Sequence, residues 1–342
     1  PDVSFKVIYE VHDKPSGVGE PKEKTIGADA APGLNNEKQH NSVLSAIYRY
    51  FLMDWNREVF QKTLFSHNLS LSNEQLVTYS LEETGRALLD FLEHNPLLTT
   101  QPFIAIAGPS ETGKTSYVIP YIDRLLKNYS GKQSCLISGD CFVIPKSERN
   151  PFLPYPYNMF NVEMMISIVS AAKDGLPIGL PIYDKKLRNT LYITKEEISK
   201  YAKQGNSPIA LPYYQGYFIP LMDTIVKDHN WNILEGKFLA VHATTGEVVE
   251  VLSTENKLIL FEVTSALLFP EIRKLTNGAV FVWSSDDMRF QNVVGAQKKR
   301  ERMLYYTPDQ AKERLRKSMS YEDSPVMSTL KFSNVIFINQ CI

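Results

Sequence analysis

Residues 108–115 (GPSETGKT) constrain what this 342-residue chain can fold into more than any other segment. They match the pattern G-x-x-x-x-G-K-[ST], and they lie between an apolar run of strand length, residues 102–107, and a segment that can be helical to about Asn128 despite Pro120. Glycine lets the backbone approach an anion closely, and the start of a helix contributes N–H groups and a positive dipole end. The pattern predicts a strand, a phosphate-binding loop and a helix; the alternative is a tight glycine turn with a solvated lysine.

A loop of this kind binds a nucleoside triphosphate, which we expect to be ATP with Mg²⁺. We expect the Lys114 side chain to be exposed and to bridge the β- and γ-phosphates, and the Thr115 hydroxyl to bind Mg²⁺. The predicted nucleotide contacts are Gly108, Pro109, Ser110, Glu111, Thr112, Gly113, Lys114, Thr115 and Ser116. The loop alone leaves open whether the nucleotide is hydrolysed, donated to a small molecule or only sensed.

Bulk composition argues against several classes of partner. With 37 basic and 38 acidic side chains, the formal net charge of −1 gives no electrostatic footprint for nucleic acid or for an anionic membrane. The longest apolar runs are far shorter than the roughly 20 residues that cross a bilayer. Three scattered cysteines favour a reducing, cytoplasmic setting. No secretory signal is seen at Pro1, but the sequence does not start with Met, so targeting at that end stays open. We therefore expect a small-molecule acceptor as partner, and neither nucleic acid nor a membrane.

Short apolar runs recur along the chain, with helical segments between several of them. Four of these runs follow the loop, at residues 135–137, 258–261, 279–283 and 335–338. The alternation predicts an α/β fold in which a parallel sheet is covered by helices on both faces. Together with the phosphate loop, it indicates a P-loop NTPase-type parallel sheet flanked by helices.

The N-terminal region differs from this alternation. Residues 3–11 alternate apolar and polar side chains as a strand does, and residues 12–41 have the composition of a linker or long loop. Helical spacing follows at 42–65 and at about 73–94. The core positions predicted for the second helix are Leu76, Leu81, Leu88, Leu89 and Leu92.

The pattern changes again between residues 191 and 256. A short charged helix is expected at 195–203, and a hairpin whose turn is residues 244–247 (TTGE) is expected near the end of this stretch. The predicted units are an N-terminal strand and flexible linker at 1–41, a helical preface at 42–98, and a P-loop domain at 99–342. An inserted β-containing subdomain is expected at about 191–256.

Further segments follow the loop in a particular order: residues 136–142 (LISGDCF), 158–161 (NMFN), Gly175, 181–184 (PIYD) and 260–262 (LFE). In order and spacing they resemble the uridine kinase and phosphoribulokinase family of P-loop small-molecule kinases, over roughly residues 100–190 and 257–340. The helical preface resembles that of pantothenate kinases in the same superfamily. The resemblance implies ATP-dependent phosphoryl transfer to a hydroxyl of a small molecule by a divergent member.

The resemblance also implies roles for individual residues. Asp140 matches the general base that accepts the proton of the acceptor hydroxyl; the alternative is a helix cap or turn residue. Glu262 matches the acidic residue that helps to hold hydrated Mg²⁺. The alternative for Glu262 is a solvent-facing carboxylate, because Val263 stands where the family has glycine. Tyr183 and Asp184 match the element that lines the acceptor pocket, and Tyr183 can equally be a core aromatic.

Two further acceptor positions depart from the uridine kinase pattern. Asn158 aligns with an aspartate that binds ribose, and Arg188 aligns with a histidine that contacts the base. A planar guanidinium matches a carboxylate or phosphate, so these residues favour an anionic acceptor over uridine. The alternative for Arg188 is an exposed surface arginine.

The lid helix that closes over the transferring phosphate in this family is only partly matched. Arg289 aligns with a lid arginine, whereas Asn292 and Val293 stand where arginines are expected. The basic residues at 298–302 either replace them or form the solvated face of a helix. The leading hypothesis is a small-molecule kinase, and its rival is a nucleotide-binding regulatory or scaffold module without transfer activity. The acceptor and the oligomeric state stay open.

Overall fold

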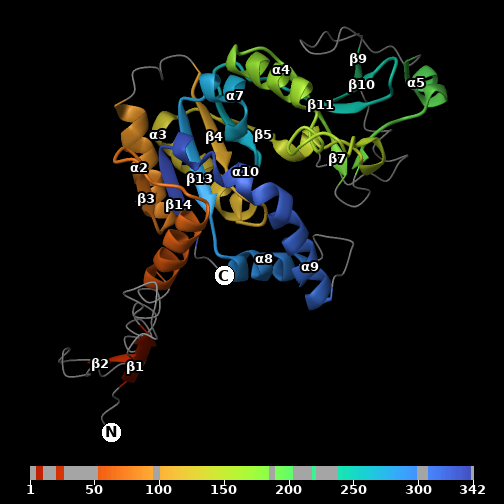
Figure 1. Cartoon of the computed structure of the whole chain (residues 1–342). Coiled ribbons are helices and arrows are strands. Elements are labelled where there is room, and N and C mark those ends of the chain that lie inside the picture. Colours follow the sequence, from red (N-terminus) through yellow and green to blue (C-terminus); the bar gives the residue numbers. More distant parts are fainter. Residues whose placement is uncertain are drawn as a thin grey trace, which may run out of the picture. The chain divides into compact units, whose positions relative to one another are not determined.

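The computed structural model describes residues 5–10, 21–26, 53–94, 101–184, 189–202, 218–220, 238–298 and 307–339. The chain divides into two compact units, Pro1–Asp54 and Trp55–Ile342. In the first unit, β1 (Phe5–Glu10) pairs with β2 (Pro21–Ile26) as an antiparallel hairpin (Figure 1). The first strand was predicted, but β2 lies within the stretch predicted to be a linker. Its polar sequence, PKEKTI, pairs with β1 along its whole length, and polar composition alone does not show such pairing.

The second unit is built on a six-stranded parallel sheet. The strands lie in the order β3-β14-β13-β4-β12-β5. Their bounds are Leu76–Thr78 for β3, Phe103–Ala107 for β4, Ser134–Ser138 for β5, Leu258–Glu262 for β12, Gly278–Trp283 for β13 and Val335–Ile338 for β14. Each of the apolar runs predicted to be strands is therefore a strand, and the predicted α/β fold class is confirmed.

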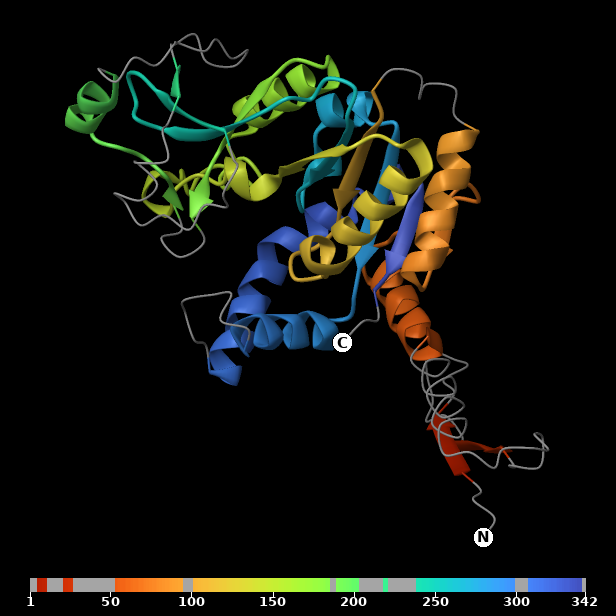
Figure 2. The same ribbon diagram turned by 180° about the vertical axis from the view of Figure 1, so that it is seen from behind.

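Both faces of the sheet are buried, as a parallel sheet requires. Along β4, Phe103 and Ala105 belong to one hydrophobic cluster, and Ile104 and Ile106 belong to the other, because successive side chains point to opposite faces. The helices α2 (Leu81–Glu93) and α3 (Ile119–Ser130) pack on the face of Ile104. The helices α4 (Val162–Lys173), α7 (Pro270–Leu275) and α10 (Ser324–Met327) pack on the other (Figures 1 and 2).

Residues 42–52 and 95–98 of the predicted helical preface lie outside the described residues, and within the described part its second helix is shorter than predicted and a strand is added. A helix covers residues 53–66, and the helix expected from about residue 73 begins at Leu81. Ser80 caps that helix, because its hydroxyl accepts the Glu83 N–H at 3.1 Å. Leu76 lies instead in the edge strand β3, opposite Val335, and is 49% exposed. Of the other predicted core leucines, Leu88 and Leu92 are buried, and Leu81 and Leu89 are half-buried.

Strands of the predicted insertion, together with β6, which precedes it, form a second, antiparallel sheet. Its strands lie in the order β6-β11-β10-β9, with bounds Ile178–Pro181, Val248–Leu252, Leu239–His242 and Phe218–Pro220. The predicted hairpin is β10 and β11, and the charged helix is α5 (Lys195–Ala202). Because β11 pairs with β6, the inserted sheet is anchored directly to the strand that leads into residues 181–184. None of the helices in the described ranges has both the length and the apolar character needed to cross a membrane.

Candidate functional site

The loop at residues 108–115 joins β4 to the π-helical turn η3 (Lys114–Val118), which continues into α3. Gly108 has a φ of 127°, and a Cβ atom there would lie 2.1 Å from the Val282 carbonyl oxygen. Gly113 has a φ of 86° and lies close to the Asn339 amide. Both glycines of the pattern are therefore required by backbone conformation and by close packing. Pro120 falls in the first turn of α3, where its missing N–H costs little.

Five consecutive carbonyl groups of the loop each accept a hydrogen bond from a side chain. The bonds are Lys114 Nζ to Gly108 O and to Pro109 O, both 2.8 Å, Arg289 Nε to Ser110 O, 2.8 Å, Asn292 Nδ2 to Glu111 O, 2.8 Å, and Asn339 Nδ2 to Thr112 O, 2.7 Å. In a trans peptide the N–H points away from the preceding C=O. Lys114 belongs to the loop itself, whereas Arg289, Asn292 and Asn339 hold the carbonyls of residues 110–112 from other segments. Fixing each carbonyl also fixes the direction of the amide that follows it, and consecutive fixed amides can form an anion site.

Lys114 is buried, not exposed as predicted. It is only 5% exposed, because its ammonium group lies against the loop carbonyls of Gly108 and Pro109. Burial lowers the pKa of Lys114, and the negative charges of Glu262 and Glu322 act in the opposite direction. In this conformation the lysine supports the loop from within.

Thr115 and Glu262, the predicted metal ligands, are in contact. The Thr115 hydroxyl donates to Glu262 Oε2 at 3.2 Å. Glu262 is the last residue of β12 and pairs in register with Ile106, so it lies beside the strand that enters the loop. One hydroxyl and one carboxylate are hard oxygen ligands, which suit a Mg²⁺ ion that keeps most of its water. Within the described ranges, no three His, Cys, Asp or Glu residues are grouped as a metal site.

Asp140 lies near the same carboxyl ends of the strands as Glu262. The strand β5 ends at Ser138, which pairs in register with Glu262, and Asp140 follows two residues later in a short 3₁₀ turn. The Ser138 hydroxyl accepts the Asp140 N–H at 3.4 Å, so Ser138 takes the capping position that was the alternative role for Asp140. The Asp140 residue itself is exposed.

Val263 is accommodated by a glycine on the neighbouring strand end. A Cβ atom on Gly139 would lie 2.2 Å from Val263 Cγ2, and Val263 is 3% exposed. The departure from the family pattern at Val263 is therefore matched by the absence of a side chain at Gly139. Glu262 keeps its position beside the loop despite this departure.

The predicted acceptor residues lie on two separate elements. Asn158 belongs to the loop before α4, and its Oδ1 is buried without a hydrogen-bond partner. Tyr183 is half-buried in β7 (Tyr183–Asp184), which pairs with β8 (Asn189–Thr190). For Asp184 the structure describes only the backbone, and Arg188 lies outside the described residues. Residues 299–302 of the basic cluster also lie outside them.

Arg289 supports the loop through α8 (Asp286–Lys298). Its guanidinium pairs with Asp323 through two contacts, Nη1 to Oδ2 at 2.5 Å and Nη2 to Oδ1 at 3.0 Å, and its side chain is 3% exposed. With Nε on the Ser110 carbonyl, Arg289 is held against the loop. Asn292, one helical turn later, holds the next carbonyl, so the two side chains share one face of α8.

Three supporting residues were not predicted from the sequence as part of the site. They are Asn292, Asn339 and Glu322, and Glu322 Oε1 accepts the Ser110 N–H at 2.8 Å. The spacing of Arg289 and Asn292 is a helical-face signal that could have identified Asn292. Glu322 has no such signal, because 212 residues separate it from Ser110 in the chain.

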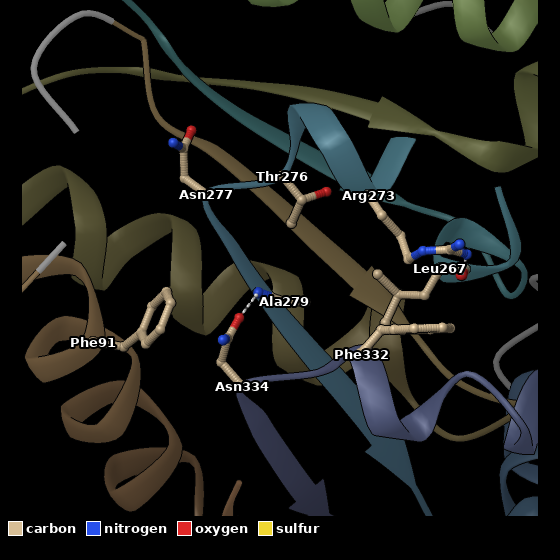
Figure 3. Close-up of a pocket in the computed structure, with 8 residues that line it drawn as sticks. All are labelled: Phe91, Leu267, Arg273, Thr276, Asn277, Ala279, Phe332 and Asn334. Carbon is tan, nitrogen blue, oxygen red and sulfur yellow. Dashed lines mark hydrogen bonds between the residues drawn. The ribbon is translucent and has the colours of Figure 1, made fainter. Parts of the chain in front are cut away.

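A polar recess of about 220 Å³ lies near the amino-terminal ends of the strands, whereas the phosphate loop follows the carboxyl end of β4 (Figure 3). Asn277 and Asn334 line it, and their Oδ1 atoms accept the N–H groups of Phe103 and Ala279, at the starts of strands β4 and β13. Arg273 donates to the carbonyls of Leu267 and Leu268 in the 3₁₀ turn before α7, and its guanidinium lies 4.1 Å from the centre of the Phe332 ring. The two asparagines hold the starts of these strands, and none of the residues that line the recess belongs to the phosphate loop.

Comparisons with known proteins find similar structures but no sequence relatives. No family model matches the chain, and no curated protein matches it. A solved structure described as a possible uridine kinase, from Bacillus stearothermophilus, is 15% identical with a TM-score of 0.39, and the match covers 74% of this chain and 98% of that one. A D-glycerate 3-kinase from Cryptococcus neoformans is 11% identical with a TM-score of 0.44, covering 76% and 95%.

The chain's own geometry gives the fold. The phosphate loop follows the buried strand β4, and the next strand in the sheet, β12, ends in the carboxylate that contacts Thr115. Helices cover both faces of this parallel sheet, and an antiparallel sheet is added to it. The chain therefore has a P-loop NTPase-type fold, a parallel sheet flanked by helices with an added antiparallel sheet.

Proposed function

We propose that the protein is a small-molecule kinase that transfers the γ-phosphoryl group of ATP to a hydroxyl of its acceptor. The observation that carries the proposal is the contact between Thr115 and Glu262 at the mouth of the phosphate loop. The register of Ser138 with Glu262 supports it, because it brings Asp140 to the same edge. Phosphoryl transfer requires a phosphate site, hard oxygen ligands for Mg²⁺ and a carboxylate base. Residues suited to all three roles lie at the carboxyl ends of strands β4, β12 and β5.

The nucleotide phosphates would be held by residues 108–116. The backbone amides of the loop would bind them, and Lys114 would exchange its two carbonyl partners for phosphate oxygens. Thr115 and Glu262 fit Mg²⁺, which when bound would neutralise charge on the transferring phosphate. The side chain of Lys114 would add a positive charge at the same phosphates.

Asp140 would act as the general base. The acceptor oxygen attacks the γ-phosphorus while the bond from that phosphorus to the bridging oxygen of ADP breaks, and the hydroxyl proton passes to the Asp140 carboxylate. The exposure of Asp140 at the strand edge supports this role, since the carboxylate can reach a bound acceptor. Ser138 positions its backbone through the cap.

The acceptor is proposed to be an anionic metabolite bound by Asn158, Tyr183, Asp184, Arg188 and Arg289. The unpartnered Oδ1 of Asn158 supports its part, because a buried amide oxygen without a donor is costly and a bound hydroxyl would satisfy it. The role of Arg188 rests on the sequence alone. Arg289 would have to leave Asp323 before it contacted a phosphate.

The ion pair between Arg289 and Asp323 favours a second candidate function. Because Asp323 already neutralises Arg289, a nucleotide-binding regulatory module without transfer activity would need none of the rearrangement that transfer requires. The two functions differ in turnover, not in nucleotide binding.

The test is ATP consumption with a panel of acceptors: nucleosides, pantothenate, glycerate and sugar phosphates. We expect ADP formation that depends on one anionic acceptor and on Mg²⁺, and that is lost in Lys114→Ala. Tight ATP binding with no acceptor-dependent turnover across the panel would support the regulatory module instead. Absence of ATP binding by the parent protein would contradict both.

A further inference from the structure

A carboxylate of the protein itself is bound to the phosphate loop. Glu322 belongs to the π-helical turn η7 (Met319–Asp323), and its Oε1 accepts the Ser110 N–H at 2.8 Å. Its Oε2 accepts the hydroxyl of Ser318 at 2.9 Å. The residue is 3% exposed. A buried anion of the chain therefore occupies one amide of a loop whose pattern is that of an anion site.

Carboxylates of the chain already lie near the cations around the loop. Lys114 lies close enough to Glu322 and Glu262 for both carboxylates to raise its pKa, against the larger lowering caused by burial. Arg289, a second buried cation beside the loop, is paired with Asp323. Each of these cations thus has a carboxylate from the chain beside it, and an incoming phosphate meets fixed negative charge in a region of low dielectric.

We propose that Glu322 is an internal competitor of the nucleotide phosphates, which weakens nucleotide binding and weakens ATP more than ADP. This inference rests on the proposed function, because it takes residues 108–115 as the nucleotide site. ATP carries one more phosphate than ADP, and so more negative charge near Lys114. The repulsion from Glu322 is therefore larger for ATP. Glu322 sets affinity and takes no part in the chemical step.

The carboxylate can be separated from its hydrogen bond. In Glu322→Gln, the amide oxygen still accepts the Ser110 N–H, and the Ser318 hydroxyl can turn to accept from the amide nitrogen. Only the charge is removed. The matched control is Glu313→Gln, which makes the same change in net charge on the exposed surface of α9 (Pro308–Ser318), where Glu313 pairs with Lys317.

The experiment measures the dissociation constants of ATP and of ADP, each with Mg²⁺ at fixed ionic strength, by calorimetric titration. We expect Glu322→Gln to bind ATP about tenfold more tightly, or about 1.4 kcal/mol, with a smaller gain for ADP. Glu313→Gln should leave both constants within about twofold. An unchanged or weaker affinity for ATP, or an equal gain for ADP and ATP, would overturn the proposal.

A second variant covers the case in which Glu322→Gln fails to fold. Ser318→Ala keeps the charge but removes the hydroxyl that holds Oε2, so the carboxylate is freer to leave Ser110, and we expect a smaller gain in ATP affinity. Weaker ATP binding by Ser318→Ala would count against the inference. If the parent protein does not bind ATP, the proposed function fails and this inference with it; if the parent binds ATP and neither variant binds it more tightly, only this inference fails.

Discussion

At the scale of single residues, the site depends on pairs that compensate each other. Val263 is tolerated beside Glu262 because Gly139 has no side chain, and Gly108 is required because the Val282 carbonyl lies where a Cβ would be. The sequence identified Thr115 and Glu262 individually through the motif and the resemblance. It did not show that Lys114 is buried, because that depends on the direction of the loop carbonyls.

Asp140→Asn tests the base directly. An amide cannot accept the proton, so we expect kcat to fall by roughly 10² or more, while the affinity for ATP changes by less than about twofold. Steady-state kinetics and nucleotide titration measure the two effects separately. The control is Asp309→Asn, an exposed acid in the first turn of α9, which should keep parental activity. Loss of ATP binding in Asp140→Asn would show instead that Asp140 is a metal ligand or a structural residue.

Gly139→Ala tests the compensating pair. Its Cβ would overlap Val263, and overpacking of this kind costs about 1–3 kcal/mol of unfolding free energy. In a Val263→Gly background the overlapping atoms are absent, so we expect the same change to cost at least about 1 kcal/mol less. Urea denaturation of the four proteins of the cycle gives the coupling energy. Equal costs in the two backgrounds would mean that the two positions are independent.

At the scale of elements, α8 holds the phosphate loop. The resemblance predicts a lid helix there, and the departures from its arginine pattern have a structural explanation: Asn292 binds the Glu111 carbonyl one helical turn beyond Arg289. Strands buried on both faces were predictable because their residues are almost all apolar. The edge strand β3 and the polar strand β2 were not, because pairing with a partner strand forms them and their own pattern does not show it.

Asn292→Ala tests this support. The variant leaves the Glu111 carbonyl without its donor, and loss of such a hydrogen bond costs about 1 kcal/mol. If the support shapes the phosphate site, the dissociation constant for ATP should rise by about fivefold, at the same energetic scale. Gln291→Ala is the neighbouring exposed control and should bind ATP as the parent does. If both variants bind ATP as the parent does, the bond stabilises α8 but does not shape the site.

At the scale of the whole chain, the sequence predicted the fold class and the parallel sheet with its phosphate loop, since apolar runs and the loop motif are local signals. The full set of residues around the phosphate loop could not be predicted in this way, because it depends on contacts between distant segments of the chain. Glu322, Asn339 and Arg289 reach the loop from segments far along the chain, and each is placed there by the order of strands in the sheet. The hairpin β10–β11 was predictable from its turn, whereas its pairing with β6 was not.

Ligand-dependent unfolding tests the site as part of the folded unit Trp55–Ile342, which contains the loop. A ligand that binds only the folded state at 100 times its dissociation constant adds about 2.7 kcal/mol to the free energy of unfolding. For a unit of this size we expect Tm to rise by about 5 °C or more with ATP and Mg²⁺, followed by calorimetry. Chelation of Mg²⁺ should reduce the shift, because Thr115 and Glu262 then contribute no metal-mediated contact, and Lys114→Met should nearly abolish it. AMP lacks the phosphates that the loop and Lys114 are expected to hold, so a shift as large with AMP as with ATP would place nucleotide binding elsewhere on the protein.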